Sequence, residues 1–337
     1  MTARAALGPM VRAGETAEGP FSLVITPESA GWGYSSLRIV ELPASGTVSF
    51  ATGEDEMVVL PLSGGCVVEG EGERFEITGR RDVFSRVTDF AYMPRDAEVT
   101  LSSASGGRFA LPAARATRRL PARYGPAERV SVELRGAGQA SRQVNNFCMP
   151  GTFEADKLIA VEVLTPGANW SSFPPHKHDE ERGGETRLEE VYYFEVRASG
   201  PQGPVIGSDG PGYQRVYSSG ADRQIDVCTE VRSGDAVLIP HGWHGPSMAT
   251  PGYDLYYLNV MAGPGTERAW RICDDPAHAW VRGTWDAQEV DPRLPLATTE
   301  EREPAPAPAP QWGGFTAAGP EQSHPTATAT PAGKDRT

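Results

Sequence analysis

Short runs of β-branched and aromatic residues recur along the chain, and glycines and prolines separate them. Five examples are SLRIVEL, MVVLPL, VYYFEV, DAVLIP and DLYYLNVM. Such residues favour strands, and the 38 glycines and 30 prolines supply the turns between them. No long stretch has the apolar periodicity of an amphipathic helix. The sequence therefore predicts a mostly β protein built as barrels or sandwiches, rather than a doubly wound parallel sheet.

The charge of the chain excludes some classes of partner. Its 337 residues include 31 Lys and Arg against 44 Asp and Glu, which gives a net charge of −13. A surface of this sign repels nucleic acid and anionic membranes, so neither is expected as a partner. The opening MTARAALGPMVRAGETAEG lacks the apolar stretch of a signal peptide, and no run of about eighteen apolar residues predicts a membrane span. We therefore expect a cytoplasmic protein whose four cysteines are reduced thiols.

Two parts of the chain have similar patterns, which indicates an internal duplication. The run EMVVLPLSGG, which starts at Glu56, resembles EVYYFEVRASG, which starts at Glu190. Each part later contains an Asp, then apolar residues, then a proline. The first part has DVF…YMP and the second has DAVLIP. We infer one half at residues 20–115 and another at residues 140–285.

The end of the chain differs in composition from everything before it. Residues 304–337 hold seven prolines and eight alanines, with almost no large apolar side chains. Such a segment cannot bury enough apolar surface to order itself. We therefore expect residues 298–337 to form a disordered tail rich in proline and alanine.

Four of the six histidines lie in two short clusters, FPPHKHDEE and IPHGWHGPS. In a strand, residues two apart point to the same face, so His176 and His178 present two imidazoles to one point. Glu190, twelve residues after His178 in the apolar run LEEVYYF, is a third candidate ligand. His244 or His241 would complete the set from the turn after Pro240. Imidazole and carboxylate ligands together fit Zn, Mn, Fe or Ni.

The order H-x-H, Glu and a distant G-D…P…H resembles the metal-binding pattern of the cupin superfamily. Gly234, Asp235 and Pro240 stand at its second motif. Further motifs are similar to those of the 5-deoxy-glucuronate isomerase family of inositol catabolism, namely WSSFPPHKHD, EEVYYF, QRVY and PGYDLYYLNVMAG. The resemblance covers roughly residues 20–285, and the specific motifs are concentrated in the second half.

This resemblance implies a bicupin fold, two tandem antiparallel β-barrels of the jelly-roll type, of which only the second binds metal. The first half contains no histidine and has Glu98 at the place that matches His244. Family members usually read Pro-Glu-Gly-Tyr-His at the second motif, whereas this chain reads PHGWH, which puts His241 near the pocket mouth. For a divalent metal ion, with Zn or Mn favoured over Fe or Ni, the implied ligands are His176, His178, Glu190 and His244.

The resemblance also implies an aldose–ketose isomerase that converts 5-deoxy-D-glucuronate to 5-dehydro-2-deoxy-D-gluconate without a redox cofactor. The candidates for moving a proton between the adjacent carbons are Tyr192, Glu189, Lys177 and a metal-bound hydroxide. Strand alternation puts Tyr192 on the ligand face and the other two side chains away from it, so Tyr192 or hydroxide is favoured. A hydride shift is the alternative to proton transfer.

The carboxylate of a small sugar-acid substrate needs a local cation in a chain of this net charge. Arg215 in QRVY is the first candidate, because a guanidinium binds a carboxylate through two hydrogen bonds, and Arg142 and Arg268 are weaker ones. The other side chains expected to bind substrate are Tyr217, His241, Tyr257 and Asn259. A homo-oligomer is compatible with this site, but no motif specifies one.

Two other functions would use the same ligands, a cupin dioxygenase and a non-catalytic cupin that binds a sugar acid. The family resemblance favours the isomerase over the dioxygenase. Loss of catalysis usually erases ligands, and all four are present here. The chain has neither a G-x-S-x-G elbow nor a G-x-x-x-x-G-K-[ST] phosphate loop, which excludes common hydrolase and kinase classes.

Overall fold

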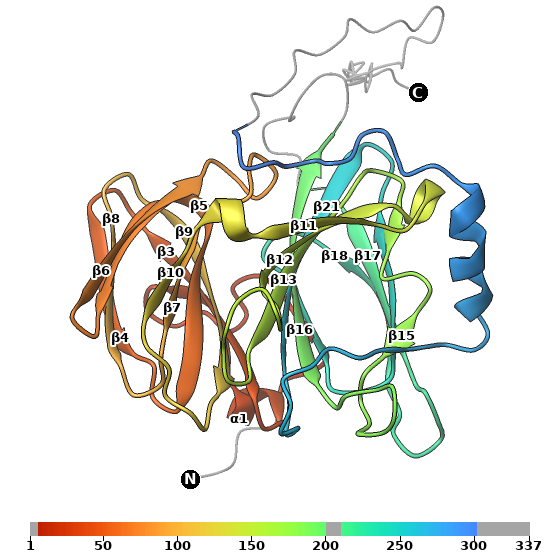
Figure 1. Ribbon diagram of the computed structural model, residues 1–337, viewed down its shortest axis with the longest axis horizontal. Helices are drawn as coiled ribbons and strands as arrows, with labels where there is room; N and C mark the ends of the chain where they lie inside the picture. The colour runs from red at the N-terminus through yellow and green to blue at the C-terminus, as the bar shows by residue number, and fades with distance from the viewer. Residues whose placement is uncertain (1–5, 200–209, 302–337) are drawn as a thin grey trace, which may run out of the picture.

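A computed structural model describes residues 6–199 and 210–301 and consists mostly of antiparallel strands curled into two barrels that lie side by side (Figure 1). The predicted fold class of two tandem antiparallel barrels is confirmed. The part of the predicted tail from residue 302 onward lies outside the described residues. Within the described ranges, no helix is both long and apolar enough to cross a membrane.

The first barrel is a nine-stranded antiparallel system in the described part of the chain. Its main path runs β10-β7-β5-β9-β3-β2, and β4, β6 and β8 join it through β5 and β8. The long β5 is shared between both parts of the barrel, since it pairs with β7 and β9 early and with β6 and β8 late. The bounds are β2 (Phe21–Ile25), β3 (Ser35–Leu42), β4 (Gly46–Ala51), β5 (Asp55–Gly70), β6 (Glu73–Arg80), β7 (Phe90–Met93), β8 (Glu98–Ser103), β9 (Gly107–Arg115) and β10 (Arg123–Gly125).

The second barrel is made of two antiparallel sheets. The larger has the order β1-β19-β16-β21-β13-β12-β11, with β1 (Met10–Val11), β11 (Ser131–Arg135), β12 (Arg142–Cys148), β13 (Ile159–Thr165), β16 (Glu189–Ala198), β19 (Ala236–Ile239) and β21 (Tyr253–Ala262). The smaller sheet has the order β18-β17-β20-β15-β22, and β14 also pairs with β20. Its strands are β14 (Trp170–Ser171), β15 (His176–Lys177), β17 (Gly212–Tyr217), β18 (Asp226–Val231), β20 (Trp243–Ala249) and β22 (Cys273–Asp274). Strand β1 shows that the N-terminal segment, outside both predicted halves, joins the second barrel.

Helical segments are short and lie outside the sheets. They are α1 (Pro27–Ala30), η1 (Ala127–Arg129), η2 (Gly138–Ala140) and η3 (Ala279–Ala287). Figure 1 shows η3 beside the second barrel, on the side away from the first barrel.

Alternation along the strands produces three apolar cores. On β16, Tyr192 and Phe194 face the interior of the second barrel, whereas Val191 and Tyr193 face the first barrel. A separate cluster, which includes Met57 and Val59 of β5, fills the first barrel. Strands at the junction are therefore apolar on both faces, which explains the continuous apolar runs in the sequence.

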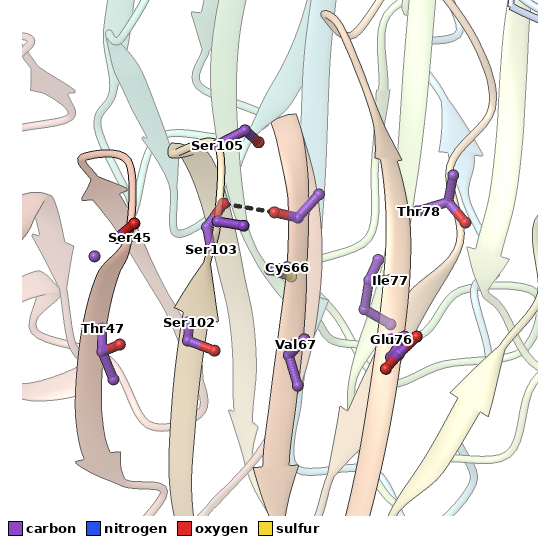
Figure 2. A pocket seen from close by; sticks show the side chains of 13 residues that line it. Ser45, Thr47, Cys66, Val67, Glu76, Ile77, Thr78, Ser102, Ser103 and Ser105 are labelled. Atoms are coloured by element: carbon purple, nitrogen blue, oxygen red, sulfur yellow. Dashed lines mark hydrogen bonds between the residues drawn. The ribbon is translucent and has the colours of Figure 1, made fainter.

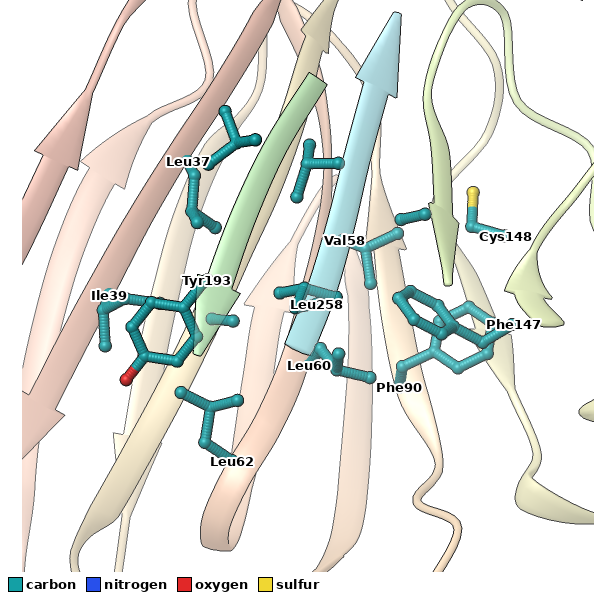
Figure 3. Close-up of a cluster of buried hydrophobic side chains, with 14 of the residues drawn as sticks. Leu37, Ile39, Val58, Leu60, Leu62, Phe90, Phe147, Cys148, Tyr193 and Leu258 are labelled. Carbon is teal, nitrogen blue, oxygen red and sulfur yellow. The ribbon is translucent and has the colours of Figure 1, made fainter. Parts of the chain in front are cut away.

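The core between the barrels is the largest of the three, and Figure 3 shows part of it. Leu37 and Ile39 of β3 meet Tyr193 of β16 and Leu258 of β21 there. All four side chains are almost completely buried, so the contact between the two barrels is itself a hydrophobic core.

The chain still contacts this junction where the tail was predicted to begin. Ala297 is fully buried and exchanges two hydrogen bonds with the side chain of Gln143. The carbonyl of Thr298 accepts a 2.7 Å hydrogen bond from the backbone N–H of Val87. The predicted start of the tail at residue 298 therefore falls on a residue that is tied to the first barrel.

Candidate metal centre

The histidine clusters and Glu190 meet inside the second barrel. His176 lies on β15, directly opposite His244 of the neighbouring β20, and His178 follows β15. Glu190 comes from β16, in the other sheet of the barrel. The two sheets therefore bring these side chains together across the barrel interior.

Three of the four predicted ligands form a compact group. One ligand atom from each of His178, Glu190 and His244 lies within 4.8 Å of the others, and all three residues are buried. Oε2 of Glu190 is 3.1 Å from Nε2 of His178 and 3.3 Å from Nε2 of His244. The ring of His176 lies beside them, with its centroid 4.5 Å from that of His244, but outside the 4.8 Å group.

The hydrogen-bonding pattern leaves a buried nitrogen of this group without a partner. Nδ1 of His244 lies 3.2 Å from the carbonyl of Gly242, to which it donates when protonated, so Nε2 carries the free lone pair. That Nε2 makes no hydrogen bond although it is fully buried and close to the Glu190 carboxylate. A lone pair facing a carboxylate oxygen with no proton between them is an arrangement that a shared cation would stabilise.

The protonation equilibria of two of the imidazoles favour the form that binds a metal ion. Burial, with the charge of His178, lowers the pKa of His244 to about 4, and burial also lowers the pKa of His176. Burial opposes the protonation of His178 too, but its hydrogen bond to Glu190 outweighs this and raises its pKa. His244 and His176 are therefore neutral at neutral pH, which is the form that binds metal ions.

A network of charged groups fixes the turn that carries His244. Oδ2 of Asp179 accepts a 2.9 Å hydrogen bond from the backbone N–H of Gly242, and Oδ1 accepts one from Lys177. Gly242 has a φ of +92°, and a Cβ there would lie 2.6 Å from the carbonyl oxygen of Tyr217. Glycine is therefore required at the bend. Asp179 was not among the predicted site residues, although its position directly after His178 could have indicated it.

Tyr192 lies next to the metal ligands and belongs to a chain of hydroxyl groups. Its ring stacks on that of Tyr257 at 4.8 Å, and its ring centroid is 6.1 Å from that of His244. The hydroxyl of Ser172 lies 3.1 Å from that of Tyr192 and 3.0 Å from that of Tyr257. Burial raises the pKa of both tyrosines, so both hydroxyls are protonated at neutral pH. Nothing in the sequence distinguished Ser172 as part of this chain.

Two predicted proton-transfer candidates have other contacts. The carboxylate of Glu189 accepts hydrogen bonds from the backbone N–H groups of residues 33–35 in the first half of the chain. The ammonium of Lys177 is buried and pairs at 2.7 Å with both Asp179 and Glu185. The structure thus places both side chains in fixed ion-pair or hydrogen-bond networks, and of the three candidates only Tyr192 adjoins the ligand group.

The residues predicted to bind substrate divide into two sets. Asn259 and Tyr257 face the metal centre, and Asn259 donates to Glu190. Arg215 and Tyr217 share the face of β17 opposite to that of the buried Val216. Arg215 pairs with Asp226 of the adjacent strand, and the Tyr217 hydroxyl donates to Asp275.

His241 and Arg268 also lie apart from the ligand group. His241 lines a pocket of about 360 Å³ that Trp32 and Ile225 also line. Arg268 donates three 2.7 Å hydrogen bonds to the backbone carbonyls of Leu158, Phe153 and Cys148.

A pocket of about 700 Å³ lies in the first barrel, away from the histidines (Figure 2). Serine and threonine hydroxyls line much of it, and Glu76 is its one carboxylate. Burial raises the pKa of the Cys66 thiol there to about 12, so this sulfur is an unreactive thiol at neutral pH.

Glu98, which matches His244 by position, is exposed on β8. The described first barrel therefore offers no counterpart of the metal centre.

Known proteins resemble this chain over most of its length. A 5-deoxy-glucuronate isomerase from Geobacillus thermodenitrificans is 39% identical over 260 residues, which covers 76% of this chain and 89% of that protein. The protein of that name from Bacillus subtilis strain 168 is 34% identical over 76% of this chain and 91% of its own length.

Solved structures share the fold. An IolB-like protein from Salmonella typhimurium LT2 superimposes with a TM-score of 0.73 at 33% identity, over 82% of this chain and 99% of that one. The oxalate decarboxylase of Lactobacillus farciminis, at 10% identity and a TM-score of 0.53 over 80% of this chain and 89% of that one, shares the fold alone. The family model described as KduI/IolB matches residues 10–281, and the chain therefore belongs to the KduI/IolB family.

Proposed function

We propose that this protein is a metal-dependent aldose–ketose isomerase that converts 5-deoxy-D-glucuronate to 5-dehydro-2-deoxy-D-gluconate in inositol catabolism. The observation that carries the proposal is the buried group of His178, Glu190 and His244, in which Nε2 of His244 faces a carboxylate without a hydrogen bond. The names of the relatives support the reaction and its substrate. They favour the isomerase over a dioxygenase, which the ligand set alone would also serve.

The donor set fits a divalent cation. His178, Glu190 and His244 would hold it, and His176 is the fourth candidate because its ring adjoins that of His244. Two or three imidazoles with one carboxylate suit Zn or Mn, and they also accept Fe or Ni; His178 would give up its proton when the metal binds. When bound, the cation would act as a Lewis acid that polarises the substrate carbonyl.

The residues of the chain would handle the proton that moves between oxygens. An aldose–ketose interconversion moves one hydrogen between adjacent carbons and one proton between the oxygens that these carbons carry. The Tyr192 hydroxyl is protonated, adjoins the ligand group and exchanges hydrogen bonds through Ser172 with Tyr257. We assign Tyr192 the role of relaying this proton, because Glu189 and Lys177 are engaged elsewhere: its Oη would give its own proton to one substrate oxygen and take up the proton that the other oxygen releases.

The test combines metal analysis with an isomerase assay on 5-deoxy-D-glucuronate. We expect the purified protein to hold a divalent metal and to form the ketose, and His178→Ala to lose most of both while remaining folded. His278→Ala is the matched control, because His278 is exposed and outside the ligand group, so it should keep both. Oxygen consumption with no ketose formed would instead support the dioxygenase, and metal-free protein with full activity would overturn the proposal.

A further inference from the structure

Arg142 is a buried cation on the inner face of the second barrel. It is two residues before Val144 on β12, and Val144 packs in the apolar core of this barrel. Residues two apart on a strand share a face, so Arg142 extends into the same interior, and the residue is only 5% exposed. A guanidinium in such a place ordinarily has a carboxylate partner, because an unpaired buried charge is costly.

The other arginine that is almost completely buried in the described structure, Arg80, has such a partner in Glu162. Among the residues that the structure describes, Arg142 has no carboxylate within ion-pair distance. Its one hydrogen bond runs from Nη1 to the carbonyl of Ala140, at 3.0 Å. Most of its five N–H donors are thus left for something outside the chain.

The surroundings of Arg142 add further donors and positive charge. Its guanidinium lies 5.5 Å from the centroid of the Trp285 ring, and that of Arg282 lies 5.2 Å from the same ring. Nε1 of Trp285, in η3, is buried and donates to nothing in the described structure. We name Arg142 and Trp285 together the donor pair. Burial, with the charges of Arg135 and Arg282, lowers the pKa of Arg142 to about 10, so it still carries its charge at neutral pH.

Two series of contacts connect the donor pair to the metal centre. Tyr257 interacts electrostatically with Arg142 and leads through Ser172 to Tyr192, beside the metal ligands. On the other side, Arg282 pairs with Asp274, which stands opposite His176 in the β15 and β22 pairing.

From this geometry we infer that the donor pair binds the carboxylate of a sugar acid whose carbonyl end lies at the metal centre. The inference rests on the proposed function and adds to it the residues that recognise the carboxylate, by which the enzyme would distinguish a uronate from a neutral aldose. A carboxylate would accept two hydrogen bonds from the guanidinium and one from Nε1 of Trp285, and it would neutralise the unpaired charge. Arg215, the first candidate from the sequence, already has Asp226 as its partner.

The test compares two sugars that differ only at the carboxylate, 5-deoxy-D-glucuronate and 5-deoxy-D-glucose. We expect Arg142→Gln to lower kcat/KM for the acid about 100-fold and to leave that for the neutral sugar within about threefold. Arg142→Lys, which keeps the charge, should recover part of the loss. Trp285→Phe keeps an aromatic ring for stacking but removes the donor, so it should lower kcat/KM for the acid about tenfold.

Arg135→Gln is the matched control. Arg135 lies opposite Arg142 in the register of β11 and β12 and stacks on Trp270, but its guanidinium forms an ion pair with Glu133. This substitution should change the ratio between the two sugars far less than Arg142→Gln does, because it removes a nearby charge but no donor of the pair. Equal losses for both sugars in Arg142→Gln and Trp285→Phe would overturn the inference. Calorimetric titration of each variant with 5-deoxy-D-glucuronate separates the two proposals. Loss of binding in Arg142→Gln and Trp285→Phe but not in Arg135→Gln supports the donor pair, whether or not the wild type forms the ketose. A wild type that binds the acid but forms no ketose would overturn the proposed function alone.

Discussion

Asn259 donates a 2.5 Å hydrogen bond from Nδ2 to Oε1 of Glu190, and so directs the other carboxylate oxygen toward the two imidazoles. The two residues lie on neighbouring strands of the larger sheet, and both are buried. The contact holds the carboxylate in one orientation, since its second oxygen lies 3.1 Å from His178. Substitution of a residue that orients a ligand in this way typically lowers metal affinity about 10- to 100-fold.

Asn259→Ala is therefore expected to weaken metal binding about 10- to 100-fold while the protein remains folded. Competitive titration of the metal-loaded protein with a chelator measures the change. Asn145→Ala is a suitable control, because Asn145 is equally buried and also donates to a carboxylate, that of Glu162, at the junction of the barrels. It should lower the free energy of unfolding without changing metal affinity, and equal losses of affinity in both variants would contradict a specific role for Asn259.

The sequence was sufficient to predict the class of the fold but not how its barrels pack. Apolar runs bounded by glycine and proline predict strands reliably. A strand such as β16 is apolar on both faces, however, so its pattern does not reveal that Tyr192 faces one barrel and Tyr193 the other. Strand β1 was not predictable for a different reason. It has only two residues, which are too few to form a recognisable pattern, so the sequence does not predict that the N-terminal segment pairs with β19.

The candidate site was predictable where sequence spacing alone sets geometry. Strand alternation predicted that Glu190 faces the ligands from β16, and the structure places it with His178 and His244. The predicted pairing of His176 with His178 on one strand is less exact, because His178 lies just after β15 and His176 lies outside the 4.8 Å group. Partner choice for charged side chains depends on neighbouring strands that are distant in sequence. Arg215 was thus preferred over Arg142, although Asp226 lies beside Arg215 in the fold and no carboxylate in the described chain pairs with Arg142.

The two histidines of the PHGWH motif should respond differently to substitution. His244→Ala should lose bound metal and activity together, because its Nε2 faces the Glu190 carboxylate inside the barrel. His241→Ala should keep its metal, since His241 lines a separate pocket next to Trp32 and Ile225. Metal content and isomerase kinetics of both variants test this, and an empty site in His241→Ala would show that the ligand assignment is wrong.

Removal of one partner from the buried ion pair between Arg80 and Glu162 should strongly destabilise the protein. Arg80 comes from the first barrel and Glu162 from the second, and neither side chain is more than 2% exposed. Tyr256 and Asn145 also donate to this carboxylate. Glu162→Gln leaves the guanidinium buried without a charged partner, so we expect it to lower the free energy of unfolding by about 3–5 kcal/mol. Urea denaturation measures the change.

A surface pair in the first barrel provides the control for that experiment. Glu69 lies 2.9 Å from Arg74, and both side chains are about half exposed. Because solvent screens such pairs, Glu69→Gln should change the free energy of unfolding by less than about 1 kcal/mol. Similar losses in Glu69→Gln and Glu162→Gln would mean that burial at the junction adds nothing to the ion pair.

Asp156 should make stability depend on pH in the acid range. Its side chain is 5% exposed and accepts hydrogen bonds from the backbone N–H groups of Thr117 and Arg118 and from both of their side chains. Burial opposes ionisation, but these donors outweigh it and lower the pKa of Asp156 from 3.8 to about 2. A carboxyl group whose pKa is lower in the folded state stabilises that state at pH values above its unfolded pKa.

We therefore expect Asp156→Asn to cost about 1–2 kcal/mol at pH 7, and this difference from the wild type to disappear as the pH falls from about 4 to about 2. Thermal or urea unfolding at a series of pH values measures it. Glu154→Gln is the control, because Glu154 is two residues away and exposed, with Arg123 as its partner. Its effect should be small at every pH. If the cost of Asp156→Asn persisted unchanged at pH 2, the contribution would come from packing or neutral hydrogen bonds rather than from the charge of the carboxylate.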